Sequence, residues 1–287
     1  MKNTKKMIYS FEVFPPKPTT PVEKVSGCFE KLAALRPDFI SVTYGAGGGL
    51  NGGKLTCELS AKIQNTYHVK SIAHLPCISY SKEEIAQVLQ DFKANGITDI
   101  LALRGDKSPE RPEKTDFKHA SDLIDFIKSQ GDFEIYGACY PEVHPEAISA
   151  VSDLQHLKEK VDKGAKHLIS QLFFDNQYFY EFREKCEIIG IHVPIEAGIM
   201  PVVNASQIQR MVSLCGTSLP RKFTVMMQRF GHSPEAIRDA GIAYAVDQIV
   251  DLAANGVDGI HLYTMNNPYV AERITQAVSG ILGRCEN

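Results

Sequence analysis

The stretch DILALRGD, residues 99–106, shows the pattern that decides the fold: a short apolar run ends in chemically capable polar residues. A parallel strand buried on both faces has such a continuous apolar run rather than an alternating pattern. Seven other stretches have the same form: YSFEVFPP (9–16), DFISVTYG (38–45), KSIAHLPC (70–77), EIYGACYP (134–141), HLISQLFF (167–174), PIEAGIMPV (194–202) and GIHLYTMN (259–266). Eight such strands, each followed by a helix, predict an α/β fold, a closed (β/α)₈ TIM barrel with its active site at the C-terminal ends of the strands.

The composition suits a soluble globular protein with a large core. Of the 287 residues, 44% are hydrophobic and 23% are charged, and no linker-like segment interrupts the chain, so we expect a single domain over residues 1–287. Lys and Arg number 31 and Asp and Glu 34, a net charge of −3 that argues against general binding to nucleic acid or to a membrane surface. No stretch approaches a membrane-spanning length, and the basic start leads into a strand-length run rather than a signal peptide.

The seven cysteines are scattered, with no CxxC and no paired metal-ligand spacing. An odd count without a secretory signal predicts reduced thiols in a cytoplasmic protein. Cys77 and Cys139 lie in expected strands, where a core position is favoured over a redox role. No zinc, calcium or HExxH pattern occurs, so no metal site is expected.

Helical spacing fills the gaps between the expected strands. We expect helices over residues 21–36, 81–95, 121–130, 153–163, 234–255 and 269–282. Ser81 followed by Glu84 is typical of a capping box at a helix start. Residues 219–230 are interpreted as an extra strand or an irregular excursion. The glycine-rich segment 45–53 lacks both the P-loop and the GxGxxG pattern, which favours a mobile lid over a phosphate cradle.

Glu12 is the strongest candidate for catalysis. On the first expected strand, Ser10 and Glu12 point to one side while Phe11 and Val13 point to the other. An acid inside a barrel among aromatic side chains pays a desolvation cost, which raises its pKa and lets it hold a proton near neutral pH. We therefore predict a general acid, with a carboxylate paired to a nearby Arg or Lys as the alternative.

The sequence Arg104-Gly105-Asp106 follows the fourth expected strand. Arg104 can bind a phosphate or a carboxylate with two parallel hydrogen bonds, and Gly105 permits close approach of a ligand to the backbone. Asp106 is the second candidate acid. The structural alternative is an Arg–Asp ion pair that closes the loop.

Two more strand ends carry groups suited to a ring-shaped ligand. Tyr140 offers a flat face and a hydroxyl, and His144 lies in the loop that follows it. Gln171 carries an amide that can match both donors and acceptors at the edge of a heterocycle, or satisfy backbone groups at the barrel rim. Lys160 has the pattern of an ordinary solvated helix lysine.

Eight motifs occur together and in order: SFEVFPP, SVTYGAGG, HLPC, ALRGD, YPEVHPEA, QLFFD, GIMPV and YTMN. With these motifs essentially the whole chain resembles the methylenetetrahydrofolate reductases, of the short bacterial kind without a C-terminal extension. The resemblance implies a cytoplasmic FAD-binding barrel that reduces 5,10-methylenetetrahydrofolate to 5-methyltetrahydrofolate. This reaction belongs to one-carbon metabolism and supplies methionine biosynthesis. A homo-oligomer is expected.

The resemblance also implies roles for single residues. Glu12 would be the general acid, Asp106 a catalytic residue beside the flavin that contacts the pterin, and Gln171 a hydrogen-bonding partner of the folate. The positions that would hold FAD are Thr43, His74, Arg104, Gly105, Asp106, His119, Ala120, Tyr140, His144, Asp153, His156 and Lys160.

Four positions depart from the family pattern. Ala205 stands where a gating Phe is frequent, His119 where a Tyr often contacts FAD, His156 where an Asn occurs, and Asn267 where an Arg is usual. These departures bear on the electron donor. NADH or NADPH is the expected donor, in a ping-pong sequence through FAD. A ferredoxin or a partner flavoprotein is the alternative.

Two other functions compete with the reductase. A lyase or aldolase with a phosphorylated substrate would need a phosphate site after strands seven and eight, and PVVNASQ and MNNPY have no glycine-rich anion loop. A non-catalytic barrel, serving as an electron-transfer subunit or scaffold, is disfavoured by the presence of both Glu12 and Asp106.

Overall fold

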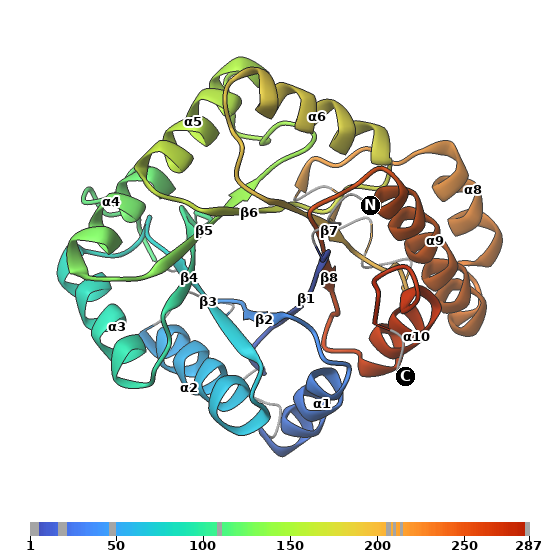
Figure 1. Ribbon diagram of the computed structural model, residues 1–287, viewed down its shortest axis with the longest axis horizontal. Coiled ribbons are helices and arrows are strands. Elements are labelled where there is room, and N and C mark those ends of the chain that lie inside the picture. The colour runs from blue at the N-terminus through green and yellow to red at the C-terminus, as the bar shows by residue number, and fades with distance from the viewer. Residues whose placement is uncertain are drawn as a thin grey trace.

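A closed ring of eight parallel strands forms the centre of the molecule, and the helices surround it (Figure 1). The structure, a computed structural model, describes residues 6–16, 22–45, 50–107, 111–204, 208, 211–212 and 215–284. The strands are β1 (Ile8–Val13), β2 (Phe39–Val42), β3 (Lys70–Pro76), β4 (Asp99–Leu103), β5 (Glu134–Cys139), β6 (His167–Ser170), β7 (Ile195–Ile199) and β8 (Gly259–Tyr263). Each strand pairs with the next along the chain, and β8 pairs with β1. The predicted (β/α)₈ barrel is confirmed.

The helices lie between successive strands and pack on the outside of the barrel (Figure 1). They are α1 (Val22–Ala34), α2 (Leu50–Tyr67), α3 (Lys82–Ala94), α4 (Ala120–Gln130), α5 (Ala150–Lys163), α6 (Asn176–Ile188), α8 (Arg221–Phe230), α9 (Pro234–Ala254) and α10 (Pro268–Val278). The six helices expected from the sequence are all present, with ends that differ by up to four residues. The expected capping box starts α3, where Ser81 N–H donates to Glu84 Oε2 and Glu84 N–H donates to Ser81 Oγ.

The interpretation of residues 219–230 as a strand or an irregular segment is wrong, because Arg221–Phe230 forms α8. Pro220 lies at the N-cap of this helix, where its missing N–H costs nothing. The Phe223 side chain is buried, with its ring 4.4 Å from that of Phe174 and 5.2 Å from that of Tyr244. Phe223 is the buried anchor of α8, and Met226 and Met227 pack against the same cluster. The polar residues around Phe223 hid this helical spacing in the sequence.

The interpretation of residues 45–53 as a lid is wrong in its second half. Residues 50–53 form the first turn of α2, and residues 46–49 lie outside the described part of the chain. A Cβ added at Gly53 would lie 2.6 Å from the Tyr44 hydroxyl oxygen, and one at Gly52 3.0 Å from the same ring. These two glycines therefore let the Tyr44 ring lie directly against the start of the helix.

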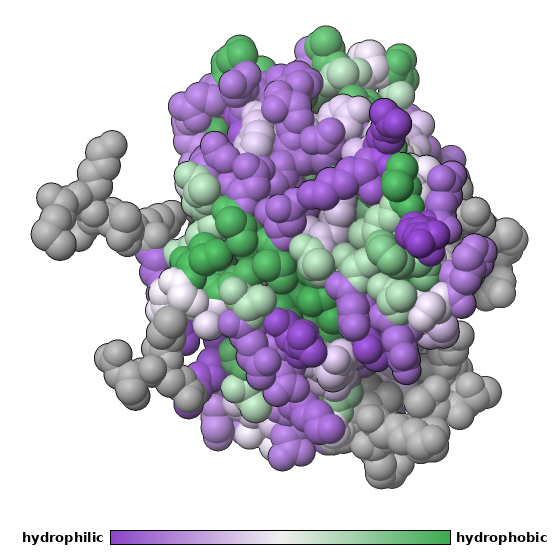
Figure 2. Space-filling model, turned by 90° about the vertical axis from the view of Figure 1, so that its right-hand side faces the viewer, coloured by the Kyte–Doolittle hydropathy of each residue, from purple (hydrophilic) through white to green (hydrophobic). Residues whose placement is uncertain are grey.

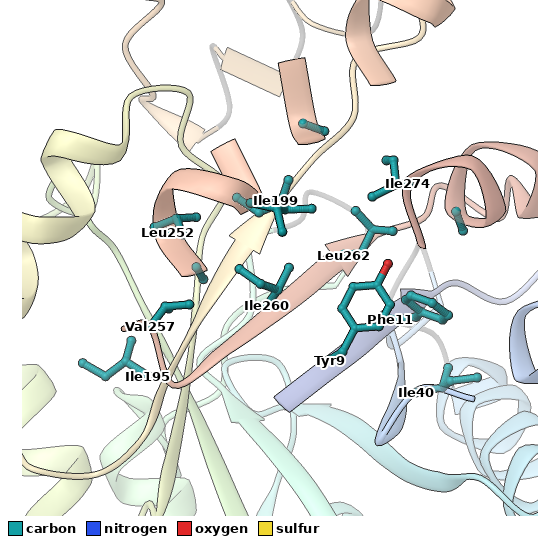
Figure 3. Packing of buried hydrophobic residues seen from close by; sticks show 14 of the residues in the cluster. Tyr9, Phe11, Ile40, Ile195, Ile199, Leu252, Val257, Ile260, Leu262 and Ile274 are labelled. Carbon is teal, nitrogen blue, oxygen red and sulfur yellow. The ribbon is translucent and has the colours of Figure 1, made fainter. Parts of the chain in front are cut away.

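Apolar side chains on alternate strand positions fill the layer between the barrel and its helices. Figure 3 shows Ile260 and Leu262 of β8 on the same side of the strand, with Phe11 of β1 beside them and Ile274 of α10 and Leu252 of α9 nearby. Burying an aliphatic or aromatic side chain of this size contributes roughly 1.5–3 kcal/mol. Because side chains alternate along a strand, the residues between these must point into the barrel.

The outer surface is mostly polar. Figure 2 shows the side that carries α8, α9 and α10, where an apolar area lies among hydrophilic residues. The exposed large apolar side chains of these helices are Val225, Phe230, Val250 and Tyr269. No helix in the described part of the chain is both long and apolar enough to cross a membrane. The six described cysteines are free, and Cys77 and Cys139 are buried in the core as expected.

Candidate active site

The end of β1 is fastened to the end of β8, and this contact positions Glu12. The Thr264 hydroxyl donates to the Glu12 carbonyl oxygen at 2.7 Å. The Asn266 amide spans the backbone of Phe14: its Nδ2 donates to the Phe14 oxygen at 2.8 Å, and its Oδ1 accepts from the Phe14 N–H at 3.1 Å. Asn266 therefore supports the strand end that carries the candidate acid.

The Glu12 side chain points into the barrel and lies between two histidines. Its Oε2 is 3.6 Å from Nε2 of His74 on β3 and 3.9 Å from Nε2 of His261 on β8. The carboxyl remains 21% exposed, so a substrate at the barrel mouth can reach it. The predicted alternation is confirmed, since Phe11 and Val13 belong to the outer core cluster.

His74 meets Glu12 as a buried neutral ring. Burial lowers the pKa of His74 to about 4, and the nearby Glu12 carboxylate opposes this effect only in part. The Nε2 atom of His74 has no hydrogen-bond partner among the described residues. A buried ring nitrogen without a partner costs free energy unless something satisfies it, so this atom is suited to bind a polar group of a ligand.

The stability of the protein should depend on His74 at acid pH. The folded-state pKa of about 4 lies below the ordinary value of 6.5, so folding favours the neutral ring. This contribution is complete above pH 6.5 and is lost as the pH falls toward 4, by about 2–3 kcal/mol between pH 7 and 4.5. We expect His74→Gln to make the decline in unfolding free energy between these pH values shallower by that amount, measured by urea denaturation.

The matched control for this experiment is His192→Gln, since the His192 side chain is exposed between α6 and β7. Its decline with pH should follow that of the wild type. Equal declines in wild type and His74→Gln would contradict the assignment of a depressed pKa to His74.

The ends of β5 and β6 bring Tyr140 and Gln171 together. The Tyr140 hydroxyl is hydrogen-bonded to the Gln171 side chain, and burial raises the pKa of this phenol to about 12. Gln171 Oε1 accepts from the Leu172 N–H at 2.9 Å. The Tyr140 ring also meets that of His144, with centroids 4.5 Å apart and planes at 60°. These predicted residues form one continuous aromatic and amide surface at the barrel mouth.

Of the two arrangements considered for the Arg104-Gly105-Asp106 segment, the structure has the first, in which Arg104 binds a carboxylate with two hydrogen bonds, and the alternative Arg–Asp ion pair is wrong. The Arg104 guanidinium binds both carboxylate oxygens of Glu146, at 2.8 and 2.9 Å, instead of pairing with Asp106. Gly105 has φ +86°, and a Cβ there would lie 2.8 Å from Cβ of Pro76, so the turn requires glycine. The Asp106 side chain is exposed at the rim.

The remaining predicted FAD residues lie beyond the ends of β4 and β5. The His119 and His156 rings stack with centroids 5.0 Å apart, and Ala120 begins α4 next to His119. Asp153 Oδ2 accepts from the His144 N–H at 3.0 Å. Lys160 is not a solvated lysine, because its Nζ donates to the Ala138 carbonyl oxygen and burial lowers its pKa.

Of three other positions singled out in the sequence, two have structural roles and one lies outside the described residues. Thr43 joins β1 to α2, since its N–H donates to the Val13 oxygen and its carbonyl accepts from the Thr56 hydroxyl. Asn267 is the N-cap of α10 and accepts from the Val270 N–H. Ala205 lies outside the described residues.

Two buried residues inside the barrel were missed from the sequence. His261 and Glu196 are both 0% exposed, and both lie in runs that were treated as apolar. The alternation in GIHLY could have predicted the position of His261: if Ile260 and Leu262 face the helices, His261 between them points into the barrel. Among the described residues no group of three His, Cys, Asp or Glu side chains could hold a metal ion.

A family model for methylenetetrahydrofolate reductase matches residues 1–279. The chain belongs to the methylenetetrahydrofolate reductase family. It is 39% identical to the 5,10-methylenetetrahydrofolate reductase of Pectobacterium carotovorum subsp. carotovorum, over 90% of this chain and 85% of that protein. It is 37% identical to the Escherichia coli enzyme of the same name, over 90% and 86% of the two chains.

Longer members of the methylenetetrahydrofolate reductase family are also similar. The Arabidopsis thaliana protein named methylenetetrahydrofolate reductase (NADH) 1 is 38% identical over 90% of this chain but 46% of its own length. Among solved structures, an uncharacterized Clostridium thermocellum protein that binds two copies of 5-methyl-5,6,7,8-tetrahydrofolic acid has a TM-score of 0.67. At 15% identity over 99% of this chain and 98% of that one, it supports the fold alone.

Proposed function

We propose that this protein reduces 5,10-methylenetetrahydrofolate to 5-methyltetrahydrofolate with bound FAD, and that Glu12 is the general acid. Membership of the reductase family supports the reaction. The observation that carries the acid role is the placement of the Glu12 carboxyl inside the barrel mouth, within 4 Å of two ring nitrogens. Such a group is sheltered from bulk water and is still within reach of a substrate.

The residues at the barrel mouth are suited to bind FAD, both its isoalloxazine ring and the rest of the dinucleotide. His74 presents a buried Nε2 without a hydrogen-bond partner among the described residues. Tyr140 with His144, and His119 with His156, form two aromatic surfaces on which rings can stack. FAD, when bound, supplies a hydride to the folate. The position of Asp106 at the exposed rim is compatible with a role beside both ring systems.

The proposed part of Glu12 is to hold one proton and give it to the folate amine that leaves the bridging methylene carbon. Loss of that amine turns the methylene group into a cationic acceptor for hydride. Gln171 is proposed to hydrogen-bond the pterin edge, and its contact with Tyr140 limits the orientations of the amide. Each of these groups extends from a strand or the residue after it, which restricts its movement.

The electron donor is proposed to be NADH or NADPH, using the same face of the flavin in turn with the folate. The name of the Arabidopsis relative specifies NADH. A ferredoxin or a partner flavoprotein is the alternative donor. Parallel anaerobic titrations with NADH, NADPH and reduced ferredoxin would distinguish them by the bleaching of the flavin band.

The decisive experiment on function uses purified protein loaded with FAD. We expect yellow protein whose dithionite-reduced flavin is reoxidised by 5,10-methylenetetrahydrofolate without oxygen, with 5-methyltetrahydrofolate as the product. Tetrahydrofolate without the methylene bridge is the control and should leave the flavin reduced. Protein that does not retain FAD, or reduced flavin that is indifferent to the bridged folate, would overturn the proposal.

A further inference from the structure

A second carboxyl lies inside the barrel, beneath Glu12 and out of reach of solvent. Glu196 of β7 is 0% exposed, while its neighbours Ile195 and Ala197 belong to the outer core cluster. Its Cα is paired in register with Gly259, where a Cβ would lie 2.9 Å from Cγ of Glu196. The glycine therefore leaves the space that this side chain fills.

Polar contacts connect Glu196 to Glu12 through two residues. The Ser10 hydroxyl lies 3.0 Å from Glu196 Oε2 and 2.7 Å from His261 Nδ1. On the other side of the His261 ring, Nε2 lies 3.3 Å from the Ser41 hydroxyl and 3.9 Å from Glu12 Oε2. Ser10, Ser41 and His261 are all 0% exposed, so bulk water does not compete for these contacts.

We propose that Glu196 is a proton reserve that sets the protonation of Glu12 through Ser10 and His261. The inference rests on the general-acid role of Glu12 proposed above. It makes Glu196 a positioning residue, since it acts on the substrate only through Glu12.

The same heavy-atom positions permit two directions of hydrogen bonding. After Glu12 has given its proton to the folate and while Glu196 is still protonated, the Glu196 O–H donates to Ser10, Ser10 donates to His261 Nδ1, and the His261 Nε2–H faces the Glu12 carboxylate. With Glu196 ionised, Ser10 donates to Glu196, His261 Nδ1–H donates to Ser10, and the bare Nε2 faces a protonated Glu12. Passing from the first state to the second moves one proton from Glu196 to Glu12 and one negative charge the opposite way.

The last contact must shorten for this transfer. Hydrogen bonds of this kind are about 1 Å shorter than the 3.9 Å between His261 Nε2 and Glu12 Oε2. Glu12 is the partly exposed member of the pair, so a rotation of its side chain is the movement that would close this distance. After Glu12 has given its proton to the folate, the reserve can restore it while the substrate still covers the barrel mouth.

The surroundings of Glu196 favour the protonated form at neutral pH. Burial raises the pKa of Glu196 to about 8, against the hydrogen bond from Ser10. Asp38 and Asp258 raise it further, and Lys70 lowers it. Tyr136 of β5 lies inside the barrel near this carboxyl, and Cys139 of the same strand interacts with it from the outer side; both hold raised pKa values, so they add no charge near pH 7.

The test that needs no catalysis is the tautomer of His261. In protein labelled with ¹⁵N-histidine and assigned by His261→Asn, we expect the wild-type ring to change from the Nε2–H to the Nδ1–H form as the pH rises through about 8, because the proton that Glu196 loses then leaves through His261 and Glu12 to the solvent. Glu196→Gln keeps the size and polarity of the side chain but cannot ionise, so its His261 signals should stay constant over this range. Signals of His261 that do not change in the wild type would overturn the proposal, whatever the enzyme catalyses.

The catalytic test is the pH profile of flavin reoxidation by the bridged folate. In Glu196→Gln we expect the alkaline limb to move about one pH unit lower, so that the rate falls about tenfold at pH 8 and stays near wild type at pH 5.5. Ser10→Ala, which breaks the connection but keeps Glu196, should show the same shift. An equal loss at every pH would indicate a merely structural role and would contradict the proposal.

The matched control is Glu134→Gln, a carboxylate on β5 that is paired with exposed Lys166 and lies outside the connected residues. Its reoxidation profile and its His261 signals should follow the wild type. If the bridged folate reoxidises the flavin in neither the wild type nor any variant, the proposed function fails. The His261 signals then still show whether Glu196 is connected to His261 through Ser10.

Discussion

Replacing Glu12 with Gln is expected to slow reduction of 5,10-methylenetetrahydrofolate by about 10²–10⁴-fold, the usual contribution of a positioned general acid. Gln has nearly the same shape as Glu and can still contact His74 and His261, so FAD binding and flavin reduction by the donor should remain within about twofold. The loss arises because an amide has no proton of suitable acidity to give to the leaving folate amine. Stopped-flow measurement of the two half-reactions separates these effects.

The control for Glu12→Gln is again Glu134→Gln, which should leave both half-reactions unchanged. If Glu12→Gln turned over folate at the wild-type rate, Glu12 could not be the acid, and the structure would then direct attention to Asp106 at the rim. Equal losses in both half-reactions would instead indicate damage to the flavin site. The split between the half-reactions therefore distinguishes proton transfer from simple disruption.

The barrel could be predicted because all eight strands are short and buried on both faces. The apolar runs end in polar residues, so the sequence marks both the strand and its carboxyl end. Helix α8 could not be predicted in this way, since its main tertiary anchor is Phe223 and its partners Phe174 and Tyr244 are distant in the sequence. The spacing of apolar residues within one segment cannot predict contacts with residues that are distant in the sequence.

The same distinction holds for the site. Glu12 was identifiable because alternation on one strand places it inside, and the structure bears out that placement. The connection from Glu196 to Glu12 depends on the register of β7, β8 and β1, which no single stretch of sequence specifies. Arg104 pairs with Glu146 rather than with its neighbour Asp106 because the loop after β5 brings Glu146 to the guanidinium, and the sequence does not specify the path of that loop.

Replacing Gly241 with Ala should lower the unfolding free energy by about 3 kcal/mol or more, which is the upper range for overpacking a core. Gly241 is buried in the middle of α9, and an added Cβ would lie 1.8 Å from the carbonyl oxygen of Val202 and 2.6 Å from its carbonyl carbon. The clash is with backbone, so no side chain can rotate away, and α9 must move off the segment that follows β7. A melting temperature lower by on the order of 10 °C is expected in calorimetry.

Gly27→Ala is the matched control. It is the same substitution within a helix, but here we expect the unfolding free energy to rise rather than fall. Gly27 is exposed within α1, and a Cβ at this position would meet nothing within 4 Å. Ala restricts the unfolded chain more than Gly does, so this variant should gain about 0.5–1 kcal/mol. A Gly241→Ala protein as stable as Gly27→Ala would mean that α9 does not pack against Val202 as closely as the structure has it. At both positions Ala restricts the unfolded chain in the same way, which favours folding. The two variants differ in sign because only at Gly241 does the added methyl group clash with the folded backbone, and this clash outweighs the gain.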